Sequence, residues 1–123
     1  MVPFSIFPLG DVLLVSIQEE IDDVSLASLL DLLGITVSQR RIRGVIVDLK
    51  DVDVVDSFLA EHLWSLASML ALLHAQTVIV GLSVPVVMTL LDFDIALKGV
   101  EFALDVEQAL DKLNVSKKTR QVT

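Results

Sequence analysis

The chain has 123 residues, of which 54% are hydrophobic, and it carries a formal net charge of −8 at pH 7. That length allows one compact domain and is too short for two ordinary ones. Three of the nine basic residues lie in the last seven positions, so the preceding chain is strongly acidic, which disfavours binding to nucleic acids and anionic membrane surfaces. There is no cysteine, which excludes thiol catalysis, disulfides and cysteine–metal sites.

The mean hydropathy of +0.73 is high for a soluble domain and predicts apolar surface that is shared with partner subunits, including further copies of the chain. Residues 62–91 carry no formal charge apart from two histidines. Turn signals at Gln76–Thr77, Gly81 and Ser83–Pro85 divide this stretch, so we expect a helix, a strand and a second helix and no membrane span. No signal peptide is recognisable, and a cytoplasmic location is expected.

Hydrophobic periodicity predicts strands and helices in the order β-β-α-β-α-β-α-β-α. In chain order these are strands 4–7 and 11–17 joined by a hairpin at Leu9–Gly10, a helix capped by Asp22 or Asp23 and ending near Arg40, a buried strand 45–49, a helix 57–73, a strand 77–80, a helix capped by Ser83, a strand 100–103, and a helix from Asp105 to Leu113. Such alternation is typical of an α/β fold with helical crossovers. We predict one domain, residues 1–115, followed by a disordered basic tail, 116–123.

The stretch from Gly44 to Leu59 is the most informative part of the sequence. Its strand ends in acidic residues, and Ser57 directly precedes a long apolar helix. The acids are Asp48, Asp51, Asp53 and Asp56. Turn and cap preferences alone can explain these positions, with Ser57 as an N-cap worth about 1 kcal/mol. The carboxylates could instead bind a divalent cation, or Ser57 could be a phosphorylation site.

The sequence shows no nucleotide-binding motif, no zinc site and no serine-hydrolase motif, and no cofactor is expected. The glycines are isolated, so no phosphate-binding loop is present. His62 and His74 are expected about 120° apart around one helix, which suits no shared metal. Ser57 lacks the Gly-x-Ser-x-Gly context of a hydrolase nucleophile.

The residues Asp48-Leu49, Val52 and Val55-Asp56-Ser57 resemble the signature loop of STAS domains, the anti-sigma-factor antagonist family. Further matches are Val78-Ile79-Val80-Gly81, Pro85, Thr89-Leu90-Leu91, Ile95-Ala96-Leu97 and Asp105 to Leu110, so the resemblance covers about 4–113. Phe58 and Leu59 after the serine are similar to the stressosome branch of the family. Asp94 departs from the glycine common in relatives, which puts the turn there in doubt.

The resemblance implies a single STAS-like domain with a mixed sheet of about five strands and four helices. It also implies a function: a non-catalytic stressosome scaffold and phosphoprotein that takes part in signal transduction in a general stress response. Such a subunit would assemble with itself and with sensory, RsbR-like STAS paralogues. It would hold an RsbT-like switch serine/threonine kinase until phosphorylation of Ser57 releases the kinase. The expected kinase-binding face comprises Asp48, Asp51, Asp53, Asp56 and Phe58.

Two other function classes stay open at this point. A phospho-aspartate receiver would also be α/β with acids at strand ends, and Asp48 could be its acceptor. However, the region around Gly10–Asp11 offers no acidic pair, and Lys98 precedes its strand instead of following one. A small metal-dependent enzyme using Asp48, Asp51 and Asp53 is the other alternative.

Overall fold

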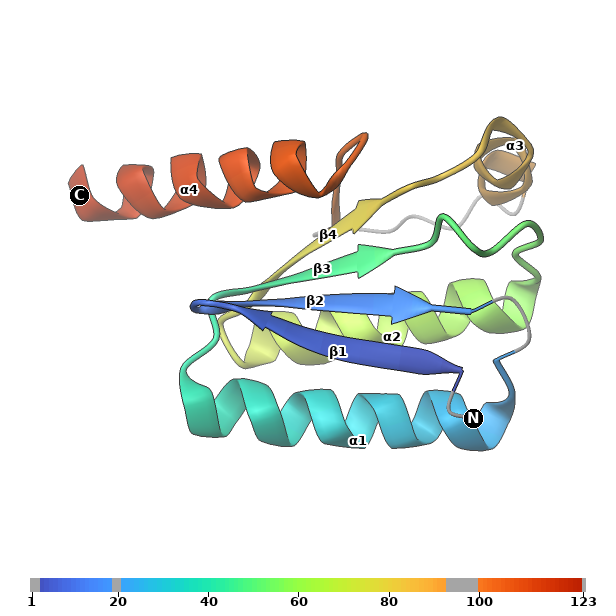
Figure 1. The fold of residues 1–123 in the computed structure, drawn as a ribbon, viewed down its shortest axis with the longest axis horizontal. Helices are drawn as coiled ribbons and strands as arrows, with labels where there is room; N and C mark the ends of the chain where they lie inside the picture. The colour runs from blue at the N-terminus through green and yellow to red at the C-terminus, as the bar shows by residue number, and fades with distance from the viewer. Residues whose placement is uncertain (1–2, 19–20, 93–99, 123) are drawn as a thin grey trace.

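A computed structural model describes residues 3–18, 21–92 and 100–122 of the chain. These residues form a five-stranded mixed sheet with four helices, as the sequence predicts (Figure 1). The elements are β1 (Phe4–Leu9), β2 (Val12–Ile17), α1 (Asp23–Arg40), β3 (Gly44–Asp48), α2 (Ser57–Leu72), β4 (Gln76–Val80), α3 (Val84–Asp92), β5 (Val100–Phe102) and α4 (Val106–Val122).

The strands lie in the sheet in the same order as in the chain, β1-β2-β3-β4-β5. β1 runs antiparallel to β2, and the other neighbours are parallel. α1 and α2 lie side by side on one face of the sheet, whereas α4 covers the opposite face (Figure 1). β2 and β3 run parallel, so their C-terminal ends lie at the same edge of the sheet. The starts of α1 and α2, which follow these strands, therefore lie near that edge too.

The hydrophobic core is divided by the sheet into two clusters. The larger cluster joins the sheet to α1, α2 and α3, and the smaller one lies under α4. β3 is buried on both faces, with Val45 and Val47 in the larger cluster and Ile46 in the smaller. This two-sided burial explains why the strand reads as an unbroken apolar run in the sequence.

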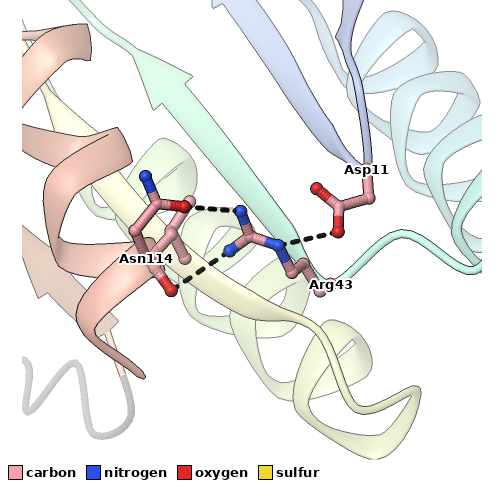
Figure 2. Close-up of polar contacts among 4 residues, drawn as sticks. Asp11, Arg43 and Asn114 are labelled. Atoms are coloured by element: carbon pink, nitrogen blue, oxygen red, sulfur yellow. Dashed lines mark hydrogen bonds and ion pairs between the residues drawn. The ribbon is translucent and has the colours of Figure 1, made fainter. Parts of the chain in front are cut away.

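α4 is held closely against the start of β3. A Cβ atom added at Gly44 would lie 2.8 Å from Cδ2 of Leu113, so only glycine leaves room for this leucine. Next to it, the Arg43 guanidinium donates to Asp11 Oδ2 at 2.8 Å, to the carbonyl oxygen of Leu113 at 3.1 Å and to Asn114 Oδ1 at 2.9 Å (Figure 2). One side chain thus links the β1–β2 turn, β3 and α4.

Several predicted helix starts are confirmed. Asp22 caps α1 by accepting the N–H of Ser25 at 2.8 Å. The hydroxyl of Ser83 accepts the N–H of Val86 at the start of α3. At α4, Asp105 accepts the N–H of Gln108, whose side chain in turn accepts the N–H of Leu104. Each cap satisfies an N–H group that has no partner within its helix.

Two predicted boundaries differ from the structure. The hairpin turn lies at Gly10–Asp11, one residue later than predicted, because Pro8 can remain in an edge strand that needs no N–H there. The α4 backbone is helical to Val122, where the sequence predicts a disordered tail. The division of the chain at Val115 stays a prediction. The family matches at 95–97 and at Asp94 lie outside the described residues.

Candidate functional site

The loop between β3 and α2 is fixed to the core by an apolar residue at every third position. Leu49, Val52 and Val55 are buried in the larger core cluster. The N–H of Leu49 also donates to the carbonyl of Val80 at 3.0 Å. Between these buried residues, Asp51, Asp53 and Val54 are exposed, and the side chain of Val54 is 71% accessible. The loop therefore presents acids and one aliphatic residue from a well-anchored backbone.

The N-cap of α2 is Asp56 and not Ser57, so the predicted capping role of Ser57 is wrong. Asp56 has an extended backbone (φ −90°, ψ 175°), and its Oδ1 accepts the N–H of Leu59 at 2.8 Å. Aspartate and serine are about equally good caps, so the residue with the non-helical backbone takes the role. Ser57 is consequently the first helical residue, and it is exposed.

The surroundings of Ser57 are acidic. Asp53 and Asp56 precede it and are exposed, and Glu61 lies one turn further along the same side of α2. Between Gly44 and Leu72 the sequence contains a single lysine, Lys50, and no arginine. A negative group added at Ser57 would therefore meet mainly like charge.

Phe58 follows Ser57 and is half-buried against the larger core cluster. Its ring contacts that of His62, with centroids 4.1 Å apart, and His62 Nδ1 lies 2.8 Å from the carbonyl oxygen of Phe58. Because a carbonyl oxygen only accepts, Nδ1 is the protonated nitrogen that donates this bond. His74 lies beyond the other end of α2, so the two histidines share no site.

Asp48 is placed differently from the other acids. It is only 8% exposed, and its Oδ1 accepts the N–H of Lys50 at 2.9 Å. A Cβ atom at Gly81, directly after β4, would lie 2.7 Å from the same oxygen, so the carboxylate packs closely against this glycine at the ends of β3 and β4. The structure thus places Asp56 and Phe58 on either side of Ser57 and leaves Asp51 and Asp53 exposed on the loop, whereas Asp48 is buried at the end of β3. In the described ranges, no group of three or more histidine, cysteine or acidic residues could hold a metal ion.

A surface hollow lies directly beside Ser57. We refer to it as the α1–α2 hollow; it has a volume of about 280 Å³. It is lined by Ile21, Leu26, Val54, Asp56, Phe58 and Leu59. Sequence reasoning missed it because Ile21 and Leu26 come from the start of α1. Their positions before the cap and in the second turn form the spacing of a hydrophobic staple, which is the signal that could have indicated it.

A STAS domain model matches residues 8–112, which is most of the chain. The chain belongs to the STAS domain family. The strand order β1-β2-β3-β4-β5, with β1 antiparallel, also differs from the parallel 2-1-3-4-5 order of receiver-like folds. This difference removes the support for the receiver alternative. Among the helices of the described part, none is long and apolar enough to cross a membrane.

Solved structures of STAS proteins are similar over nearly the whole chain. RsbS from Moorella thermoacetica, carrying a serine-to-glutamate substitution, is 26% identical with a TM-score of 0.82, covering 93% of this chain and 97% of that one. A chain of the stressosome, described as a signal integration and transduction hub, is 27% identical with a TM-score of 0.80, covering 92% and 98%.

The anti-sigma factor antagonist SpoIIAA in its unphosphorylated form has a TM-score of 0.73 at 14% identity, covering 90% of this chain and 96% of that one, which shows a shared fold. No curated protein sequence matches the chain. The STAS chain therefore has the anti-sigma-factor antagonist fold, with RsbS-like structures among its relatives.

Proposed function

We propose that this STAS chain is a non-catalytic scaffold subunit of stressosome type that binds a switch serine/threonine kinase and releases it when Ser57 is phosphorylated. The single observation that carries the proposal is the exposed hydroxyl of Ser57 at the first position of α2, beside a cap made by Asp56. Because Ser57 makes no capping bond, it can be modified without removing that bond. The similarity to RsbS and to the stressosome chain supports the same function.

The charges around Ser57 indicate how a phosphate would act. At an exposed helix N-terminus a negative group gains about 0.3–1 kcal/mol from the dipole. A carboxylate at a distance of about 4 Å repels a unit negative charge by about 1 kcal/mol in water and by about 4 kcal/mol at an effective dielectric constant of 20. Asp53 and Asp56 are exposed and precede Ser57 closely in the chain, and a phosphate adds about −1.5 to −2 charge, so a carboxylate that comes this near would oppose it. The balance favours an exposed phosphate that changes the binding surface and leaves the fold intact.

The partners follow from the same proposal. The kinase would contact Asp51, Asp53, Asp56 and Phe58 at the surface, with Asp48 supporting the loop from below. Assembly with further copies and with RsbR-like sensory paralogues would use apolar surface elsewhere on the chain. One such surface is on α3, where Val84, Met88 and Leu91 are exposed.

The test is to measure binding of the kinase to Ser57→Ala and Ser57→Asp beside the wild-type chain. We expect Ser57→Ala to retain the kinase and Ser57→Asp to bind it at least about tenfold more weakly, while both variants melt cooperatively. Mass spectrometry after incubation with the kinase and ATP should place the phosphate on Ser57. Equal affinities of the two variants, or a phosphate on another residue, would contradict the proposal.

A further inference from the structure

The α1–α2 hollow and Ser57 share their neighbours. Asp56 and Phe58, which flank Ser57 in the sequence, both line the hollow. A group that occupies the hollow therefore lies against the residues on either side of the Ser57 hydroxyl. This adjacency makes the hollow part of any surface that a protein acting on Ser57 must cover.

Five of the six residues that line the hollow are apolar and are held by the core, while Asp56 and other polar atoms make up most of its exposed surface. Leu26 and Leu59 belong to the buried cluster, and Phe58 packs against it. Val54 is exposed but lies between the buried residues of its loop, next to Val55. A concavity with anchored apolar residues and a polar edge suits an inserted hydrophobic side chain that has a polar or charged neighbour, because little order has to be gained on binding.

The size of the hollow indicates the class of occupant. Pockets that enclose small-molecule ligands measure about 300–1,000 Å³. At about 280 Å³ and open to the surface, the α1–α2 hollow falls below that range. It has room for one large side chain from a docked protein.

The rim of the hollow specifies the charge of that protein. Exposed carboxylates adjoin the lining residues in the chain: Asp22 and Asp23 follow Ile21, Asp53 precedes Val54, and Asp56 itself lines the hollow; we refer to them as the acidic rim. Helix α1 has no basic residue near this end, since Arg40 marks its other end. Complementarity thus favours a partner segment in which a basic residue stands next to the apolar one.

We propose that the α1–α2 hollow is the docking point for an apolar side chain of the switch kinase, flanked by a basic residue that pairs with the acidic rim. This inference rests on the proposed function and adds the kind of contact to it. A phosphate on Ser57 then lies at the mouth of the hollow. Docking of the apolar side chain there would remove water from the charged phosphate, which is unfavourable. Phosphorylation and insertion of the side chain therefore oppose each other.

The test compares two apolar surface residues by calorimetric titration with the kinase. Val54→Ser removes an exposed wall of the hollow, whereas Leu72→Ser changes an 82% exposed residue at the far end of α2. We expect Val54→Ser to lower kinase affinity about tenfold. Val54→Ile, which keeps an apolar side chain at this position, and Leu72→Ser should both bind the kinase like the wild type. Affinity of the wild type should also fall with added salt.

The outcomes separate the two proposals. If the kinase binds the wild-type chain and phosphorylates Ser57, but Val54→Ser and Leu72→Ser bind equally well, the docking point is wrong and the proposed function stands. If the kinase neither binds nor phosphorylates the wild-type chain, both fail. Matching melting curves of the variants by circular dichroism establish that any loss of affinity arises at the surface.

Discussion

The carboxylate of Asp56 accepts the N–H of Leu59 at 2.8 Å, directly beside the exposed hydroxyl of Ser57. The residue that stabilises the start of α2 is therefore distinct from the residue proposed to be modified. A helix cap and a phosphorylation site at one position would interfere, because modification would remove the capping acceptor. Here the two roles fall on adjacent residues.

The first prediction follows from this separation. Asp56→Ala should lower the free energy of unfolding by about 1 kcal/mol, because the N–H of Leu59 loses its acceptor. Ser57→Ala should change it by less than about 0.5 kcal/mol, as is usual for an exposed side chain without a specific contact. Urea denaturation of both variants measures the difference. A larger loss for Ser57→Ala than for Asp56→Ala would mean that the serine makes the cap in solution.

A second prediction concerns Thr77 in β4. Its side chain is 2% exposed, and within the described structure its hydroxyl oxygen has no hydrogen-bond partner. An unsatisfied buried hydroxyl costs about 1–3 kcal/mol, whereas valine has nearly the same shape and suits a strand. Thr77→Val should therefore raise the free energy of unfolding by about 1 kcal/mol in urea titrations. Destabilisation would reveal that the hydroxyl is bonded.

The contact between Gly44 and Leu113 gives a third prediction. Gly44→Ala should cost about 1–3 kcal/mol, because the new methyl group would overlap the leucine. Leu113→Ala alone should cost about 2–5 kcal/mol through the cavity that it leaves under α4. In the double variant the two methyl groups no longer conflict, so its cost should be clearly less than the sum. Strict additivity in the double-mutant cycle would contradict the close approach.

The fourth prediction is a pH dependence of stability at the start of α1. The backbone N–H of Ser25, and secondly its hydroxyl, hold the pKa of Asp22 below its ordinary value of 3.8. A lowered pKa in the folded state contributes stability that is fully present above pH 3.8 and is lost as the pH falls through the folded value. Asp22→Asn should thus be less stable than the wild type at neutral pH, and the two should converge in acid. A constant difference in urea midpoints from pH 7 to pH 2 would count against it.

The sequence predicts the order of elements well, because each buried element carries a clear pattern. The continuous apolar run of β3 and the leucine spacing of α2 each indicate one structure. The cap at Ser83 was also predictable, because no competing cap residue stands beside it, whereas at α1 the sequence left Asp22 and Asp23 open and the structure selects Asp22. Where two cap residues are adjacent, as at Asp56-Ser57, composition cannot choose between them and the backbone angles decide.

The candidate site was only partly predictable for a different physical reason. Asp56 and Phe58 are chain neighbours of Ser57, so their position next to it follows from the sequence alone, and the assignment of these residues to a kinase-binding face stays a prediction. The burial of Asp48 depends on its close approach to Gly81, directly after β4, and the α1–α2 hollow depends on Ile21 before α1. Both are contacts between segments far apart in the chain. Hydrophobic periodicity describes single elements and carries no information on which of them meet.

The strand order of the sheet has a consequence for how the chain is made. Since every strand pairs only with its neighbours along the chain, no strand has to wait for a distant segment before it can dock. The sheet can extend outward from the β1–β2 hairpin as synthesis proceeds, with each new strand joining the edge left by its predecessor. The loop bearing Ser57 follows β3, so its backbone is anchored by β4 before α4 has been translated. A nascent chain would thus present its regulatory serine before its last helix exists.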